Sequence, residues 1–183
     1  MKNLPRVLLP VFSSLAITIA ALSSANAEFE FKKDDHIVTI GNTLADRMQH
    51  DGWLETLIQS QHKDLGLIFR NQGFSGDQVA ARPRNKGFTT PEDYLKLSEA
   101  DVIFVMFGYN ESFAGDAGLE KFKGDLAKMI DDYRALKPNG ESEPRFVLFS
   151  PIAHENLEDK NLPNGNANNK RLTAYSEAIK AVA

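Results

Sequence analysis

The sequence contains no cysteine, which excludes disulfide bridges, thiolate metal sites and a cysteine nucleophile together. It also lacks a surplus of positive charge, because 21 lysine and arginine residues stand against 25 aspartate and glutamate residues in a chain of 183. Since phosphate contacts need a basic surface, we expect no nucleic-acid partner. The length predicts a single domain.

Long apolar runs are also missing from the chain, apart from residues 7–22 near the N-terminus. Two positive residues, Lys2 and Arg6, precede this run, and the small-x-small cleavage pattern Ala25-Asn26-Ala27 follows it. The run is shorter than the roughly 20 apolar residues that a membrane span needs, so a transmembrane anchor is the weaker alternative. We predict a signal peptide at residues 1–27, a domain at residues 28–183, and a periplasmic or secreted protein without a stable membrane anchor.

Four short runs rich in β-branched and aromatic residues predict strands, and helical patterns separate them. The expected strands are residues 36–40, 67–70, 101–107 and 145–149. The expected helices are residues 44–62, a short one opened by Thr90 and Pro91, residues 118–136, and residues 168–183. This alternation predicts an α/β domain with a mainly parallel sheet, of the flavodoxin-like three-layer type.

Polar loops follow three of these strands, and they are the candidate functional segments. The loops are Gly41-Asn42-Thr43, residues 73–77 and residues 108–111. If every strand is parallel, all three loops emerge at the carboxyl edge of the sheet, where α/β folds place their ligands. Asn42 and Thr43 are also favourable residues for capping the helix that follows, which is the structural alternative for this pair.

The three loops together resemble the blocks of the SGNH (GDSL-type) hydrolase superfamily, a group of flavodoxin-like esterases and lipases. The family's first block, Gly-Asp-Ser-Leu, corresponds to Gly41-Asn42-Thr43-Leu44, its second to Asn-Gln-Gly-Phe-Ser-Gly-Asp at residues 71–77, and its third, Gly-x-Asn-Asp, to residues 108–111. The resemblance implies that Thr43 is the nucleophile, and that the Gly76 amide and the Asn110 side chain stabilise the oxyanion. Asn42, Tyr109 and His154 are the expected substrate-binding residues.

Two departures from the family pattern concern the catalytic groups. Thr43 stands in place of the nucleophilic serine, and its extra methyl group restricts χ1 and crowds the line of attack. No Asp-x-x-His follows Phe149, so the sequence offers no family base. The structural alternative is that Gly76 permits a tight turn and Asn110 caps its loop.

None of the four histidines replaces that base convincingly. His36 precedes the first strand, at the opposite end of the sheet, while His50 and His62 lie on the first helix and are expected to face solvent. His154 is the histidine expected on the carboxyl edge, where it can orient a substrate or act as a substitute base.

The last helix carries an apolar stripe of Leu172, Tyr175, Ile179 and Val182 without a C-terminal cap. In a flavodoxin-like sheet this helix should lead to a fifth strand beside the fourth. We therefore expect the chain to be a fragment that lacks its last strand, which leaves the fourth strand as an apolar edge.

The resulting hypothesis is an exported ester hydrolase that acts on a small acyl ester or an acylated carbohydrate and needs neither cofactor nor metal. The alternative is a catalytically silent relative that binds the same ligands. A phosphate or nucleotide carrier is disfavoured, because the first loop lacks the glycine patterns of such proteins.

Overall fold

The computed structural model describes residues 29–83 and 87–183, and residues 31–183 form the compact unit discussed below. The predicted signal peptide lies outside the described residues and stays a prediction. In the described part of the chain, no helix is both long and apolar enough to cross a membrane.

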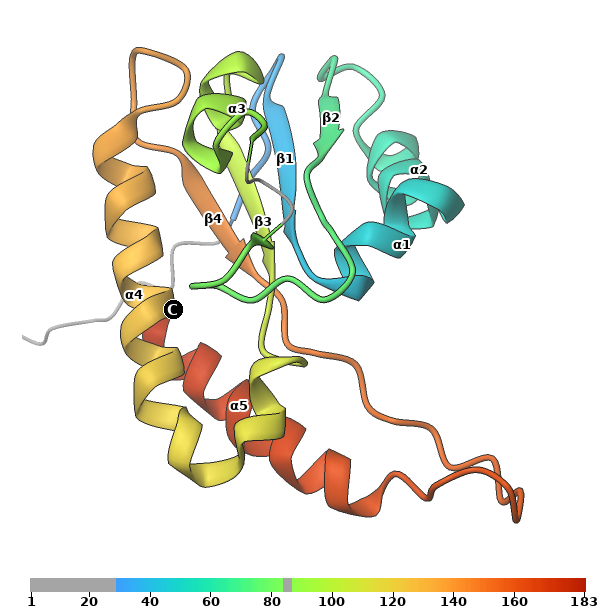
Figure 1. Ribbon diagram of the computed structural model, residues 1–183. Helices are drawn as coiled ribbons and strands as arrows, with labels where there is room; N and C mark the ends of the chain where they lie inside the picture. Colours follow the sequence, from blue (N-terminus) through green and yellow to red (C-terminus); the bar gives the residue numbers. More distant parts are fainter. Residues whose placement is uncertain (1–28, 84–86) are drawn as a thin grey trace, which may run out of the picture. The chain divides into compact units, whose positions relative to one another are not determined.

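Four strands form one fully parallel sheet, which confirms the predicted α/β class. They are β1 (His36–Gly41), β2 (Ile68–Asn71), β3 (Val102–Met106) and β4 (Arg145–Leu148), in the order β2-β1-β3-β4 (Figure 1). Each side chain of β3 is buried, as its uninterrupted apolar sequence predicts for a central strand. All four strands therefore end at the same edge of the sheet, and the loops predicted to carry function start there.

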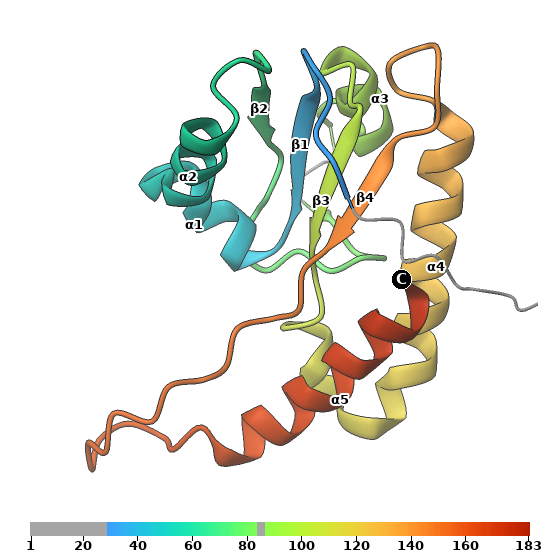
Figure 2. The ribbon, with the colours of Figure 1, turned by 180° about the vertical axis from the view of Figure 1, so that it is seen from behind.

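Helices cover both faces of the sheet, and alternate strand residues point to each layer. Val38 packs with buried residues of α3 (Pro91–Leu97), α4 (Leu119–Leu136) and α5 (Asn166–Val182). Its neighbour Ile37 packs on the opposite face, with residues of α1 (Thr43–Asp51) and α2 (Trp53–Gln61). Figure 2 shows the arrangement from behind, with α1 and α2 on the side of β2. The three-layer sandwich is confirmed.

The first helical segment is broken in two, whereas the sequence pattern predicts one helix over residues 44–62. Gly52 ends α1 in a left-handed conformation (φ 61°), and its N–H donates to the Met48 carbonyl. The second half, α2, has no buried residue, and its Trp53 and Leu57 side chains are 73% and 58% exposed although the residues of an amphipathic helix over 44–62 would include an apolar face. The side chain of His62 is half-buried against the Phe31 ring, so its expected exposure to solvent is wrong.

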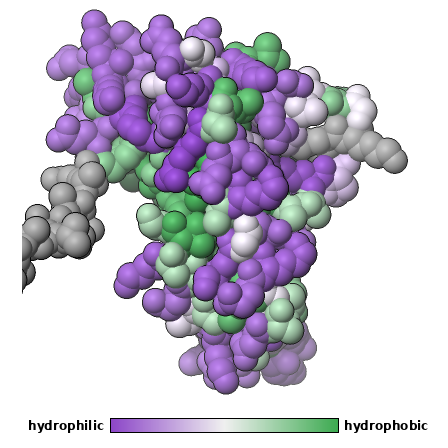
Figure 3. All heavy atoms as spheres, turned by 90° about the vertical axis from the view of Figure 1, so that its left-hand side faces the viewer, coloured by the Kyte–Doolittle hydropathy of each residue, from purple (hydrophilic) through white to green (hydrophobic). Residues whose placement is uncertain are grey.

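The other helix boundaries follow the sequence signals closely. The Thr90 hydroxyl accepts a hydrogen bond from the Asp93 N–H, with Pro91 at the first helical position, which confirms that cap. On its outer side α4 carries i,i+4 ion pairs between Lys121 and Asp125 and between Lys128 and Asp132. Figure 3, which views the molecule from the side of α4, shows a mainly hydrophilic surface with a smaller apolar area.

The last helix, α5, packs against α4 and against a 3-10 helix that the sequence did not reveal, η2 (Glu111–Gly118). The Tyr175 side chain is 1% exposed, and its hydroxyl donates to the Gly115 carbonyl at 3.0 Å. In the described residues β4 is the last strand and forms one edge of the sheet. The expectation of a fifth strand beyond the chain stays a prediction.

Candidate functional site

The end of β1 is pressed tightly against β3, and this contact positions the first candidate loop. A Cβ atom on Gly41 would lie 2.4 Å from the Met106 carbonyl oxygen, so a side chain has no room there. The Asn42 N–H donates to that same carbonyl at 3.1 Å. Thr43 then begins α1 directly at the carboxyl edge of the sheet, with an exposed side chain.

Asn42 occupies the N-cap position of α1, but neither it nor Thr43 caps the helix through its side chain, so that part of the prediction is wrong. The backbone of Asn42 has ψ −142°, outside the extended conformation usual for a cap, and its side-chain oxygen does not reach the first-turn N–H groups. The residue is 2% exposed, and its Nδ2 atom has no hydrogen-bond partner among the described residues. A buried donor without a partner is costly, which makes it a ligand-binding candidate.

The second loop is held against the start of α1. A Cβ atom on Gly73 would lie 2.5 Å from the Ala45 Cβ, so the loop backbone touches the helix. The Ser75 hydroxyl donates to the Asp46 carboxylate, and this hydrogen bond lowers the pKa of Asp46. The loop that contains Gly76 therefore lies beside the first turn of α1.

The third loop is tied to the second by two side chains. The Asn110 Nδ2 donates to the Asp77 carbonyl at 3.3 Å, one residue from Gly76. The Glu111 carboxylate accepts the N–H groups of Val79 and Gly108, at 2.8 and 2.9 Å. The three loops thus meet at one edge of the sheet, as their order in the sequence predicts.

Burial raises the pKa of Glu111, and the two backbone hydrogen bonds offset part of this effect. Because the folded state then binds more protons than the unfolded state, the free energy of unfolding should fall as pH rises above the ordinary glutamate pKa of about 4.3. We expect this decrease when the free energy of unfolding of the wild type is measured by urea unfolding at a series of pH values that spans the raised pKa of Glu111. The decrease should be smaller in Glu111→Gln. A stability difference between the two proteins that does not change with pH would contradict the expectation.

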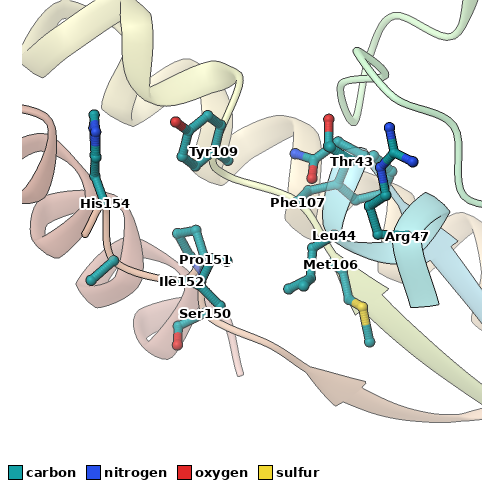
Figure 4. Close-up of a pocket in the computed structure, with 12 residues that line it drawn as sticks. Thr43, Leu44, Arg47, Met106, Phe107, Tyr109, Ser150, Pro151, Ile152 and His154 are labelled. Carbon is teal, nitrogen blue, oxygen red and sulfur yellow. The ribbon is translucent and has the colours of Figure 1, made fainter. Parts of the chain in front are cut away.

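A cavity of about 360 Å³ opens beside these loops (Figure 4). Half of the residues that line it are apolar: Leu44, Met106, Phe107, Pro151, Ile152 and Ala153. The others are polar or basic: Asn42, Thr43, Arg47, Tyr109, Ser150 and His154. An apolar wall with a few polar groups is the usual composition of a small-molecule site.

His154 has a defined hydrogen-bonding state in this cavity. The Arg171 guanidinium donates to the Asn168 side-chain oxygen, which turns the Asn168 Nδ2 toward His154 Nδ1 at 2.8 Å. Since Nδ1 accepts this hydrogen bond, the proton of the neutral imidazole lies on Nε2. The contact with Asn168 occupies Nδ1, so Nε2 is the ring nitrogen of His154 that remains to contact a ligand.

The predicted site residues are only partly brought together. Thr43, Asn42, Tyr109 and His154 line the cavity, but Figure 4 shows His154 and Thr43 at opposite ends, with Tyr109 between them. Gly76 and Asn110 are not among the lining residues; they belong to the loop contact described above. Their roles as oxyanion donors stay predictions.

Arg47 is a lining residue that the sequence reasoning missed. It lies one helical turn after Thr43, and in Figure 4 its side chain stands beside that residue. The i,i+4 spacing from a candidate nucleophile was the available signal. The other histidines stay away from the cavity: His36 Nδ1 lies 2.8 Å from the Ser98 carbonyl oxygen, and His50 is exposed near the end of α1. No cluster of three or more metal-binding side chains occurs in residues 29–83 and 87–183.

The sequence matches no protein-family model and no curated protein, but the fold matches solved structures. The acetylxylan esterase Axe2 from Geobacillus stearothermophilus superposes with a TM-score of 0.62 at 16% identity, over 85% of this chain and 74% of that chain. LAE5, an alpha/beta hydrolase enzyme from the metagenome of Lake Arreo, gives 0.60 at 16% identity, over 84% and 74%. A protein described as a GDSL-like lipase, from Parabacteroides merdae, gives 0.55 at 18% identity, over 82% and 77%.

These matches show that the chain has an SGNH/GDSL-hydrolase-like fold, as the three sequence blocks predicted. Structures described as catalytic mutants of Axe2 replace a serine, an aspartate and a histidine in that enzyme. In this chain the candidate hydroxyl after the first strand belongs to a threonine, Thr43.

Proposed function

We propose that the protein is an exported ester hydrolase that acts on a small acyl ester, such as an acetylated carbohydrate, with Thr43 as the attacking hydroxyl. The observation that carries the proposal is the position of Thr43, at the start of α1 directly after β1 and on the wall of a largely apolar cavity. An apolar wall suits an acyl group, and a hydroxyl at the cavity wall suits attack on its carbonyl carbon. The esterase names of the structural neighbours support the same reaction class.

The proposed reaction proceeds through an acyl-threonine intermediate. The Thr43 oxygen attacks the ester carbonyl, the oxyanion forms and collapses, and the alcohol leaves with the proton that Thr43 gave up. Water then releases the carboxylic acid and restores the hydroxyl. In this proposal the Gly76 N–H and the remaining Asn110 side-chain N–H are the oxyanion donors, as the family resemblance implies.

Turnover should be slow, because no described residue is placed to take the proton from Thr43. His154 lies at the far end of the cavity with its Nδ1 bound to Asn168. A positioned general base typically contributes a factor of about 10²–10⁴, and the described site lacks this contribution. The same observation favours a second candidate function: a binding protein that holds acyl or carbohydrate ligands without cleaving them.

Hydrolysis of p-nitrophenyl acetate by the full chain separates the two candidates. We expect Thr43→Ala to lower kcat/KM about 10²-fold, the loss typical of one positioned group at such a site, and Thr43→Ser to raise it because the crowding methyl is gone. Thr173→Ala is the matched control, since the Thr173 hydroxyl donates to the Asn169 carbonyl within α5 and Thr173 is not among the residues that line the cavity.

Equal rates for wild type and Thr43→Ala would remove Thr43 from the mechanism. Tight calorimetric binding of acetylated xylo-oligosaccharides without release of acetate would favour the binding protein instead.

A further inference from the structure

The described residues that line the cavity beside Thr43 include no negatively charged side chain. The chain has a formal net charge of −4, yet among the described residues Arg47 is the one charged residue on the cavity wall. The described residues place no aspartate or glutamate on that wall. A site with this lining favours an anionic ligand group over a neutral or cationic one.

Hydrogen-bond donors gather at the α1 end of the cavity. The Asn42 Nδ2 is buried without a partner, and no side chain caps the first-turn N–H groups of α1. The Arg47 guanidinium stands beside Thr43 on an exposed side chain, and its positive charge contributes to the lowered pKa of Asp46. A helix N-terminus, a free amide donor and a guanidinium are together suited to a carboxylate.

The acid nearest to this end does not occupy the place of such a ligand. Asp46 lies in the first turn of α1, but its carboxylate accepts hydrogen bonds from Ser75 and Gln49. It is not among the residues that line the cavity. The donors at the α1 end therefore remain available to a ligand.

An apolar surface continues from these donors toward Tyr109. Leu44 and Met106 lie next to the α1 end, and Pro151 and Ile152 follow along the loop after β4 (Figure 4). Such a surface stabilises a hydrocarbon tail, because each buried methylene group adds about 0.8 kcal/mol, a factor of about four in affinity.

We propose that this cavity binds a linear, medium-length carboxylate, with its carboxylate group at Asn42, the N-terminus of α1 and Arg47 and its tail along the apolar wall. The inference rests on the proposed function in one respect: such an acid is the product that hydrolysis of an acyl ester would release. Carboxylate binding does not require turnover, so the two can be tested separately.

Calorimetric titration of the full chain with two ligands tests the proposal. The first is octanoate, and the second is octan-1-ol, which has a tail of the same length but no charge. We expect octanoate to bind more tightly than octan-1-ol, and its affinity to fall as salt is added. Arg47→Gln should weaken octanoate binding about tenfold, the lower end of the range for a charge-assisted hydrogen bond, because Arg47 is exposed. Octan-1-ol binding should not change. Arg134→Gln, in α4 and not among the residues that line the cavity, is the matched control and should leave both affinities unchanged.

Equal affinity of the wild type for octanoate and octan-1-ol would overturn the proposal, as would equal effects of Arg47→Gln and Arg134→Gln. Loss of p-nitrophenyl acetate turnover in Thr43→Ala, together with no octanoate binding by the wild type, would refute the carboxylate site and keep the hydrolase. Octanoate binding without any turnover would refute the hydrolase and keep the carboxylate site.

Discussion

Replacing Glu111 with alanine is expected to lower the free energy of unfolding by about 3–5 kcal/mol. The carboxylate accepts two backbone hydrogen bonds, from Val79 and Gly108, which belong to segments after different strands. Both residues are buried, so their N–H groups cannot turn to water when the acceptor is removed. The variant therefore loses two charge-assisted hydrogen bonds and keeps two buried donors without partners.

Urea unfolding at one pH measures the effect, with two comparison variants. Glu111→Gln should lie between the wild type and Glu111→Ala, because an amide offers one accepting oxygen in place of two. Glu120→Ala should change stability by less than about 0.5 kcal/mol, since the Glu120 side chain is 87% exposed. A Glu111→Ala protein as stable as the Glu120→Ala protein would show that the two loops are held together by other contacts.

Gly41→Ala is expected to destabilise the protein by about 3–4 kcal/mol, from overpacking and backbone strain together. The added Cβ would lie 2.4 Å from the Met106 carbonyl oxygen and 2.8 Å from the Met106 Cβ. The nearest atom belongs to the backbone of the adjacent central strand, so no side-chain rotation relieves the contact. The φ of Gly41, 153°, is also one that residues with a side chain rarely adopt.

Gly124→Ala supplies the matched control for this substitution. Gly124 lies within α4 and has open space where a Cβ would be placed. Alanine there should raise the free energy of unfolding by about 0.5–1 kcal/mol, because glycine is a poor helix former. Thermal unfolding of both variants measures the difference. If Gly41→Ala proved as stable as the wild type, β1 and β3 would have to separate without cost, and the close approach would not define the site.

Both substitutions act on the scaffold of the site and not on its chemistry. Gly41 positions the start of α1, and Glu111 joins the second and third loops. Partial loss of p-nitrophenyl acetate turnover in a folded variant of either residue would therefore reflect displaced loops, while Thr43→Ala tests the reacting group itself.

The sequence by itself determined the strands, the parallel α/β class and the gathering of three loops at one edge. These features depend on local periodicity and on the rule that parallel strands end at the same edge, so short segments suffice to predict them. The Thr90–Pro91 helix start was predictable for the same reason, since a cap involves residues only three apart. The glycine at position 52 was visible too, but whether it would end a helix was not.

Tertiary structure alone decided which side chains of the site have hydrogen-bond partners and which of them lie close together. The unpartnered amide of Asn42, the Nε2–H form of His154 and the separation of His154 from Thr43 all depend on contacts between residues far apart in the chain. Periodicity cannot reveal them, because it reports which face a residue occupies and not which atoms meet there. The same holds for Arg47, whose place on the cavity wall depends on the loop after β4 that closes the opposite side.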